Sequence, residues 1–351
     1  MKQYTSLYFV GAGGIGMSAL VRYFLAKGYK VAGYDRTQSP LTTELKTEGL
    51  EIVYEESVES IPDYCRNPET TLVVYTPAIP ASHAGLVYFR EHGFRVVKRA
   101  ELLGLITQSS KGLCFAGTHG KTTTSSMAAH IFHESPIGCN AFLGGILRNY
   151  NSNLILSEQS PFTVIEADEY DRSFHWLHPY MAVVTATDPD HLDIYGTEEA
   201  YLESFARFTS LIQPGGCLIM KKGIKLVPSV KENVKIYTYS ARDGGDFHAG
   251  NIRIGDGTIV FDFVMPEGSV ADIELGVPVE INIENAVAAM AIAWLNGVSG
   301  DDMRRAMASF KGAKRRFEFW VKRPDRVMID DYAHHPDELK ASIRSVKALY
   351  P

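Results

Sequence analysis

The sequence predicts an α/β fold with parallel β-sheets, and two observations carry this prediction. Strand-like apolar runs alternate with helical patterns along the chain, as in parallel sheets that are covered by helices. Two of these apolar runs, residues 6–10 and 113–116, also lead directly into glycine-rich loops that open a helix. With 351 residues, the chain is long enough for two or three such domains.

Composition and charge narrow the class of protein. The hydrophobic content of 45% and the charged content of 22% are typical of a globular protein in water. The net charge of −6 gives no reason to expect nucleic-acid binding. No apolar run approaches the roughly 18 residues of a membrane span, and the polar residues 1–6 do not resemble a signal peptide. The four cysteines are scattered without a C-x-x-C pair, so we expect reduced thiols in a cytoplasmic protein.

A first, Rossmann-like domain is predicted over residues 1–108. After the strand at residues 6–10, five apolar residues fall on one helical face, and Gly28 ends that helix. The face consists of Met17, Leu20, Val21, Phe24 and Leu25. Further strands are predicted at residues 30–34, 71–75 and 95–98, and the polar residues 108–112 are interpreted as a linker.

A second domain, which contains the other glycine loop, is predicted over residues 109–312. Its further strands are expected at residues 162–166, 181–185 and 217–220, and a helix is expected at residues 283–295. Residues 242–273, rich in Gly and Asp, are expected to form an antiparallel excursion.

The last residues, 313–351, are predicted to begin a third Rossmann-like α/β domain after a hinge at residues 311–316. A strand at residues 327–330 is followed by a helix with three apolar residues on one face, Leu339, Ile343 and Val346. One strand and one helix cannot bury their own apolar faces. We therefore expect the third domain to be incomplete in this chain.

The first glycine loop, Gly11-Ala12-Gly13-Gly14-Ile15-Gly16, is a full G-x-G-x-x-G motif. Asp35 follows it by 19 residues, at the end of the next predicted strand. This is the fingerprint of a dinucleotide-binding domain, with the acid on a ribose hydroxyl. The pattern leaves NAD and other diphosphate nucleotides open, and Ser18 could either add a hydroxyl to the loop or sit at the helix start.

The second glycine loop, Gly117-Thr118-His119-Gly120-Lys121-Thr122-Thr123-Thr124, has the form of a shortened P-loop. Phe115 stands where G-x-x-x-x-G-K-[ST] has its first glycine. The backbone N–H groups and the helix end would face a phosphate chain. Lys121 would reach the outer phosphates, and the Thr122 hydroxyl would sit on Mg²⁺. A glycine turn with a surface lysine is the weaker interpretation, because Gly-Lys-Thr lies at a strand-to-helix junction.

Acidic residues directly follow the strand predicted at residues 162–166. Carboxylates at the carboxyl end of a parallel strand face the crevice where ligands bind, and they supply the oxygen ligands that Mg²⁺ prefers. Glu166 is the strongest candidate because it is closest to the strand end. Asp168, Glu169 and Asp171 could each belong to a solvated acidic loop.

Three further groups of polar residues are candidates. His191, in a polar loop after the strand at residues 181–185, could be a metal ligand or a base, whereas His130 and His133 are interpreted as surface or packing residues. Asn282 and Asn285 open the predicted helix, where one could cap it and the other could contact a base. The loop Asp330-Asp331-Tyr332-Ala333-His334-His335-Pro336 could hold zinc, but its carboxylates favour a role at the edge of a nucleotide.

Together, these motifs resemble the Mur ligases, the ATP-dependent amide-forming enzymes of peptidoglycan synthesis. The resemblance spans the entire chain in the expected order and rests on residues 11–18, 117–124, 166–169, 190–196, 315–318 and 330–336. It implies a cytoplasmic ligase that joins L-alanine to the carboxylate of UDP-N-acetylmuramate through an acyl phosphate, with ATP as co-substrate and Mg²⁺.

The resemblance also implies a role for each motif residue. The UDP sugar, in place of NAD, would be bound by Gly11, Gly13, Gly14, Ile15, Gly16, Met17, Ser18 and Asp35. ATP would be bound by Gly117, Thr118, His119, Gly120, Lys121, Thr122 and Thr123, by Asn285 on the adenine side, by Arg316 near the phosphates and by Asp331 at the ribose. Magnesium would be held by Thr122, Glu166 and His191. The catalytic set would comprise Lys121, Glu166, His191 and Arg316.

The chain departs from the family pattern at three points. It has no lysine between Lys121 and Lys221, so the carbamylated lysine of some members is not expected. Ile281 stands where the alanine-adding members usually carry a histidine. Roughly the last quarter of the family's length is absent, so the chain could bind nucleotides without completing the reaction.

Three other interpretations are weaker. Within the family, a recycling ligase would add a tripeptide to UDP-N-acetylmuramate, but residues 172–179 favour the alanine-adding type. An NAD-dependent oxidoreductase would explain residues 11–16 and Asp35 but would leave the Lys121 loop without a role. The third weaker interpretation is a nucleotide-gated binding protein that catalyses no reaction.

Overall fold

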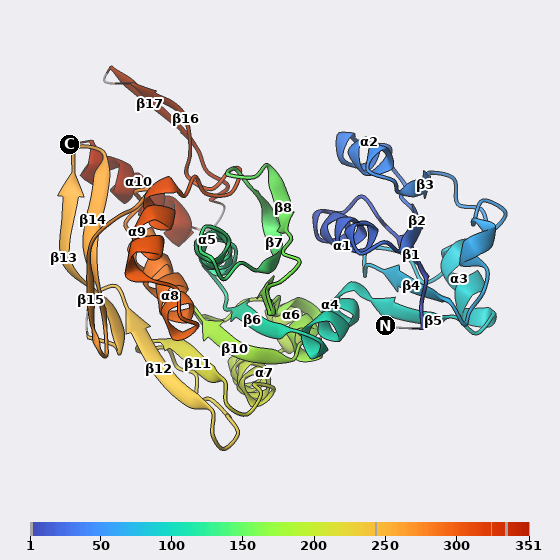
Figure 1. Ribbon diagram of the computed structural model, residues 1–351, viewed down its shortest axis with the longest axis horizontal. Helices are drawn as coiled ribbons and strands as arrows, with labels where there is room; N and C mark the ends of the chain where they lie inside the picture. The colour runs from blue at the N-terminus through green and yellow to red at the C-terminus, as the bar shows by residue number, and fades with distance from the viewer. Residues whose placement is uncertain (1–2, 243, 324, 334–335, 351) are drawn as a thin grey trace. The chain divides into compact units, whose positions relative to one another are not determined.

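The computed structural model describes residues 3–242, 244–323, 325–333 and 336–350 (Figure 1). The chain divides into two compact units, residues 1–109 and 110–351. The predicted linker at residues 108–112 is not an irregular segment. Helix α4 (Arg99–Gln108) runs up to it, and strand β6 (Lys111–Ala116) begins within it.

The described part of the first unit contains a five-stranded parallel sheet in the order β3-β2-β1-β4-β5. Its strands are β1 (Ser6–Val10), β2 (Lys30–Tyr34), β3 (Glu51–Val53), β4 (Thr71–Tyr75) and β5 (Arg95–Lys98). Its helices are α1 (Ile15–Ala26), α2 (Pro40–Thr47), the 3-10 turn η1 (Asp63–Cys65), α3 (Ala84–Glu91) and α4. The four predicted strands are confirmed, and only the three-residue β3 is additional. The strand order reverses at β1, so the first glycine loop lies at the point where such sheets bind ligands.

Helix α1 buries the face that the apolar spacing predicted. Met17, Leu20, Val21 and Phe24 are at most 2% exposed, and the chain leaves the helix at Gly28. Gly28 has a φ of 81°, a left-handed conformation that glycine adopts without strain.

The described part of the second unit contains a ten-stranded sheet in the order β15-β14-β13-β12-β11-β10-β6-β9-β7-β8. Its parallel part consists of β6, β7 (Asn140–Leu147), β9 (Phe162–Glu166), β10 (Pro179–Val184), β11 (Cys217–Lys221), β12 (Lys235–Ser240) and the start of β13 (Phe247–Gly255). Antiparallel strands extend both edges: β8 (Ser152–Ile155) on one side, and β14 (Thr258–Met265) and β15 (Gly268–Glu274) on the other. The antiparallel excursion is therefore confirmed.

Buried helices form the core of the second unit against this sheet. Helices α5 (Lys121–His133), α8 (Ile281–Leu295) and α9 (Gly300–Ser309) lie side by side (Figure 1). The 3-10 segment η2 (Tyr170–Trp176) and helices α6 (Leu192–Tyr195) and α7 (Glu198–Ser210) follow β9 and β10. Because α8 is apolar on nearly all sides, it is buried in the core. This burial places its N-terminal end beside the start of α5.

The end of the chain forms a two-stranded antiparallel sheet, β16 (Glu318–Arg323) with β17 (Arg326–Asp330), and helix α10 (Pro336–Leu349). Strand β16 was not predicted. The predicted apolar face of α10 is only partly covered, since Leu339 and Ile343 are 47% and 56% exposed whereas Val346 packs against the core of the second unit.

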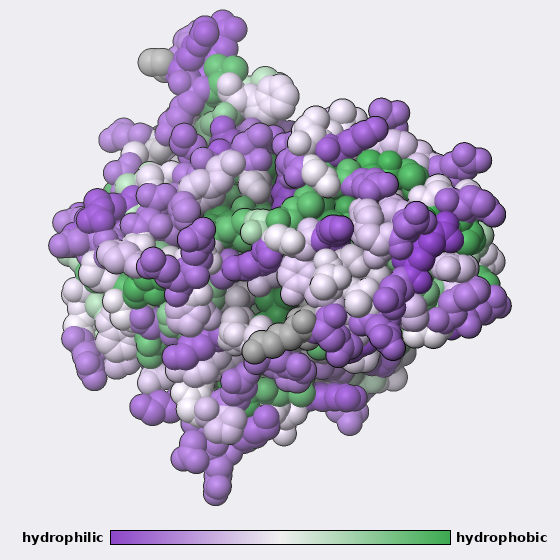
Figure 2. Space-filling model, turned by 45° about the vertical axis from the view of Figure 1, so that its right-hand side comes forward, coloured by the Kyte–Doolittle hydropathy of each residue, from purple (hydrophilic) through white to green (hydrophobic). Residues whose placement is uncertain are grey.

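Hydrophilic residues interrupt the hydrophobic ones over the face shown in Figure 2. Among the described residues, no helix has the length and apolarity needed to cross a membrane.

Candidate functional site

The glycine loop after β6 presses against the end of β10. Gly117 has a φ of 139°, and a Cβ there would lie 2.2 Å from the Thr185 Oγ1 and 2.8 Å from the Ala186 backbone N. The Thr118 N–H donates to the Ala186 carbonyl oxygen at 3.1 Å. Gly120, with a φ of 82°, is the N-cap of α5 and has no side chain that could cap it. The loop therefore presents the first N–H groups of α5 as an anion site.

Lys121 is the first residue of α5, and its ammonium group contacts both the loop and a buried acid. The Nζ donates to the Gly117 carbonyl oxygen at 2.6 Å and to the Glu169 Oε1 at 2.8 Å. Glu169 is 1% exposed, so the interpretation of this residue as a solvated acid is wrong. Burial raises the pKa of the Glu169 carboxyl, and the charge of Lys121 opposes that shift. The pair fixes the position of the lysine at the loop.

Thr122 and Glu166 meet on the other side of the same helix end. The Thr122 Oγ1 donates to the Glu166 Oε1 at 3.0 Å, and the Gly144 N–H donates to the Oε2 at 3.0 Å. Burial raises the pKa of Glu166, against the opposing effects of Lys121 and of the Thr122 hydrogen bond.

This hydroxyl and carboxylate fit a Mg²⁺ ion that is shared with phosphate. Mg²⁺ in nucleotide sites takes only one or two carboxylates and completes its shell with phosphate oxygens and water. In the described ranges, no group of three or more His, Cys, Asp or Glu residues could hold a metal by itself.

His191 lies in a different environment. It precedes α6 with a left-handed φ of 52°, and its ring packs edge-on against Tyr170 with 5.2 Å between centroids. Its Nε2 is 3.7 Å from the Asp190 Oδ2. Among the described residues, the structure does not bring the His191 ring into hydrogen-bond contact with Thr122 or Glu166.

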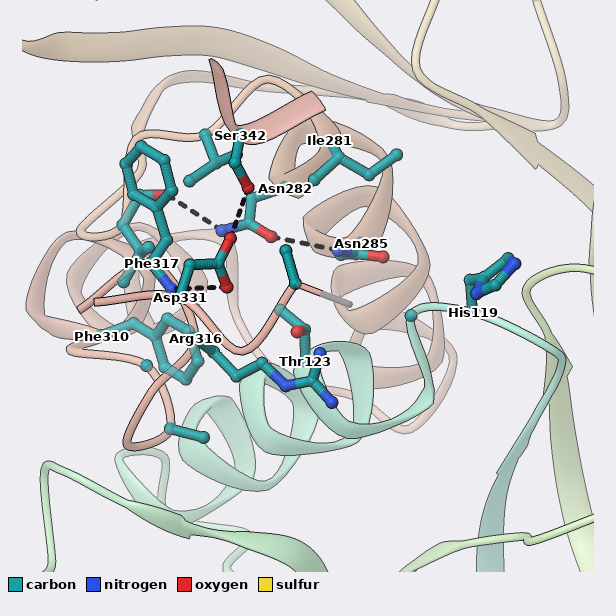
Figure 3. A pocket seen from close by; sticks show the side chains of 16 residues that line it. His119, Thr123, Ile281, Asn282, Asn285, Phe310, Arg316, Phe317, Asp331 and Ser342 are labelled. Atoms are coloured by element: carbon teal, nitrogen blue, oxygen red, sulfur yellow. Dashed lines mark hydrogen bonds between the residues drawn. The ribbon is translucent and has the colours of Figure 1, made fainter. Parts of the chain in front are cut away.

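A cavity of about 240 Å³ opens beside the glycine loop (Figure 3). Six predicted ATP-binding residues line it: His119, Gly120, Thr123, Asn285, Arg316 and Asp331. The remaining lining residues are Val277, Val279, Ile281, Asn282, Phe310, Gly312, Ala313, Phe317, Ala333 and Ser342. The cavity thus combines α5, the start of α8, the segment around residue 312 and the loop after β17, which lie far apart in the sequence.

A chain of hydrogen bonds orients the two asparagines in the cavity wall. The Thr124 Oγ1 donates to the Asn285 Oδ1, the Asn285 Nδ2 donates to the Asn282 Oδ1, and the Asn282 Nδ2 donates to the Val277 carbonyl oxygen, at 3.0–3.1 Å. Neither asparagine caps α8, because its N-cap is Glu280 and Asn282 already lies within the helix, so the capping alternative is wrong. Both residues line the cavity.

Arg316 and Asp331 approach the cavity from the end of the chain. The Arg316 side chain extends toward Thr123 (Figure 3), and its guanidinium lies 5.9 Å from the Tyr332 ring centroid. The Asp331 Oδ1 accepts the Phe317 N–H at 3.3 Å, and its Oδ2 accepts the Ser342 hydroxyl. The candidate zinc residues His334 and His335 lie outside the described residues.

Asp35 holds the glycine loop of the first unit in place through hydrogen bonds to backbone N–H groups. The Gly13 N–H donates to the Asp35 Oδ2 at 2.7 Å, and the Thr37 N–H donates to the Oδ1 at 3.1 Å. Ser18 is 1% exposed and its hydroxyl donates to the Ile15 carbonyl oxygen, so it sits at the helix start and does not extend the loop.

A cation that the sequence reasoning missed lies at this loop. A Cβ on Gly16 would lie 2.9 Å from the Arg99 Nη1. Helix α1, all of whose residues are described, has no acidic residue in its first turn. A positive helix end, a guanidinium and a glycine loop together fit a diphosphate.

Comparison with known proteins assigns both glycine loops to domains of one protein family. A family model described as "Mur ligase family, catalytic domain" matches residues 6–111, and one described as "Mur ligase middle domain" matches residues 115–293. The chain belongs to the Mur ligase family. Its matches cover both units, including the two glycine loops.

Curated Mur ligases are similar over the full length of the chain. It is 65% identical over 350 residues to the UDP-N-acetylmuramate–L-alanine ligase of Parabacteroides distasonis, covering 100% of this chain and 76% of that protein. It is 47% identical over 352 residues to the ligase of the same name from Flavobacterium psychrophilum, again covering 100% and 76%.

Solved Mur ligase structures share the fold. The UDP-N-acetylmuramate-alanine ligase of Thermotoga maritima matches with a TM-score of 0.83 and 25% identity, covering 98% of this chain and 78% of that chain. A UDP-N-acetylmuramate:L-alanyl-gamma-D-glutamyl-meso-diaminopimelate ligase from Neisseria meningitides matches with a TM-score of 0.76 and 23% identity, over 89% and 100%. The α/β fold class is confirmed.

Proposed function

We propose that this Mur ligase joins L-alanine to the carboxylate of UDP-N-acetylmuramate at the expense of ATP, in the cytoplasm, as a step of peptidoglycan precursor synthesis. The observation that carries the proposal is the 65% identity, over the whole chain, to a ligase of that name. The cavity and the phosphate loop beside it support the ATP-dependent half of the reaction, because they offer adjoining places for a base, a ribose and a phosphate chain.

A free carboxylate resists attack by an amine, so one of its oxygens must first become a leaving group. We propose that the muramyl carboxylate oxygen bonds to the γ-phosphorus of ATP while the bond to the β–γ bridging oxygen breaks, which releases ADP. The amine of L-alanine, after losing a proton, then attacks the acyl carbon, and phosphate leaves from the tetrahedral intermediate.

The residues of the loop would stabilise the charge that moves in these steps. Lys121, held by Gly117 and Glu169, would neutralise the outer phosphates, and the N–H groups of the loop would bind the phosphate oxygens. Arg316, which lines the cavity beside the loop, would approach them as well. Thr122 and Glu166 would hold Mg²⁺, which would supply charge neutralisation at the phosphates, and His191 would serve a further magnesium ion.

The UDP sugar would occupy the first unit. The G-x-G-x-x-G loop, shaped by Asp35, would bind the pyrophosphate through its N–H groups and the positive end of α1.

The proposal is tested by phosphate release from ATP by the full-length enzyme, in the presence of UDP-N-acetylmuramate and single amino acids. Release that depends on L-alanine supports it. Dependence on the tripeptide would favour the recycling ligase instead, and binding of NADH without ATP hydrolysis would overturn both ligase assignments. Lys121→Met provides the control, since it removes the phosphate-facing charge and should abolish release.

A further inference from the structure

We propose that Ser342 is a positioning residue for the nucleotide: its hydroxyl fixes the Asp331 carboxylate in the orientation that accepts a hydrogen bond from the ribose. This inference rests on the ATP binding of the proposed function and deepens it. Ser342 lies in α10 and Asp331 directly follows β17, so an interaction between separate elements shapes this part of the site.

The geometry around Asp331 carries the inference. The Ser342 Oγ donates to the Asp331 Oδ2, while the Phe317 N–H donates to the Oδ1 at 3.3 Å (Figure 3). All three residues line the cavity. With one donor on each oxygen, the carboxylate is held against rotation, yet each oxygen can still accept a second hydrogen bond. Asp331 is therefore oriented before a ligand arrives.

The resemblance to Mur ligases places Asp331 at the ribose, and the chemistry of the cavity agrees with that placement. A carboxylate can only accept hydrogen bonds, and in ATP the donors are the adenine amino group and the two ribose hydroxyls. The amides of Asn282 and Asn285 offer both donors and acceptors, which suits the edge of a base. A negative charge would repel the phosphates, so Asp331 serves best at the uncharged sugar between base and phosphates.

A second serine on the same helix provides a matched control. Ser345 lies one turn further along α10, and its Oγ accepts the Glu280 N–H at 3.3 Å, which fastens α10 to the start of α8. Ser345 is not among the residues that line the cavity. Ser345→Ala thus removes a hydroxyl of α10 that is bonded to Glu280 and does not line the cavity.

The experiment measures dissociation constants of ATP, 2′-deoxy-ATP and 3′-deoxy-ATP by calorimetry for the unmodified chain and for each variant. Ser342→Ala should weaken ATP binding about tenfold, the effect expected from losing a hydrogen bond to a charged group. It should change binding by less than about twofold for the deoxynucleotide that lacks the recognised hydroxyl. Ser342→Thr retains the hydroxyl and should restore ATP binding to within about threefold, and Ser345→Ala should leave all three constants nearly unchanged.

Equal losses for all three nucleotides, or no loss with ATP, would overturn the proposal. If Ser342→Ala does not fold, as judged by thermal melting, Asp331→Asn replaces it and must show the same selectivity for the ribose hydroxyl. Failure of the unmodified chain to bind ATP would overturn the proposed function as well. L-alanine-dependent phosphate release combined with equal losses would overturn only the role of Ser342.

Discussion

Gly144 allows Glu166 to reach its place beside the phosphate loop, and Gly144→Ala tests that role. The residue lies in β7, and its N–H donates to the Glu166 Oε2. A Cβ at this position would lie 2.2 Å from the Oε2 and 2.7 Å from the carboxyl carbon. Since contacts below about 3 Å do not occur between such atoms, the Glu166 carboxylate must move aside.

The expected loss of activity in Gly144→Ala follows from the hydrogen bonds that this movement of the carboxylate breaks. The carboxylate loses the Gly144 N–H and the Thr122 hydroxyl, both at 3.0 Å. A hydrogen bond to a charged group contributes about 1.5–3 kcal/mol. The two hydrogen bonds together contribute about 3–6 kcal/mol. If half of this total is lost from the transition state, kcat/KM should fall by about 10- to 150-fold, since ~1.4 kcal/mol corresponds to a factor of ten. The Mg²⁺ concentration that gives half-maximal rate should rise as well.

Gly145→Ala is the matched control on the same strand. A Cβ there would meet the Ala313 Cβ at 3.4 Å and the Thr122 Cγ2 at 3.5 Å, which are ordinary contacts. Both variants are compared with the unmodified full-length enzyme by L-alanine-dependent phosphate release over a range of Mg²⁺ concentrations. Activity of Gly144→Ala within twofold of Gly145→Ala would refute the assignment of Glu166.

Three further predictions concern stability and the two glycine loops. Burial lowers the pKa of His130 from 6.5 to about 4. Between these pH values the imidazole is protonated in the unfolded chain but neutral in the folded chain. The free energy of unfolding should therefore fall by about 3 kcal/mol as the pH falls from 6.5 to 4. Urea unfolding of His130→Asn should lack this component. Asp35→Ala removes the acceptor that holds the Gly13 N–H, so the glycine loop should lose its fixed shape and UDP binding should weaken about tenfold in calorimetry. Gly117→Ala should abolish the thermal stabilisation by ATP, because its Cβ would overlap Thr185.

The sequence was sufficient to predict those strands and loops that are formed by one contiguous segment. Buried parallel strands are nearly continuous apolar runs, and β1, β2, β4 and β9 were predicted with their observed bounds. Both glycine loops were also predicted, because a strand, a turn and a helix start are contiguous in the chain. The antiparallel strands after residue 242 followed from composition in the same way.

The sequence did not predict which polar side chains are buried or which residues they contact. Glu166 and Glu169 lie three residues apart in one acidic run, yet one contacts Thr122 and the other Lys121. The second contact places Glu169 in the interior, where an ion pair with Lys121 balances its charge. Periodicity contains no signal for this difference, since it depends on how the chain turns after β9.

The sequence by itself determined the α/β architecture, the two phosphate-binding loops and the resemblance to Mur ligases, because each is encoded in contiguous residues. Only the tertiary structure decided which distant residues share the cavity. Val277 and Phe310 form part of its wall, and the Ser342 hydroxyl donates a hydrogen bond to Asp331. The physical reason is that a hydrogen bond between residues of separate elements requires both elements to be packed in place. Helix α8, apolar on nearly every side, is positioned by burial in the core, and its Asn285 reaches the loop of Lys121 only through that packing.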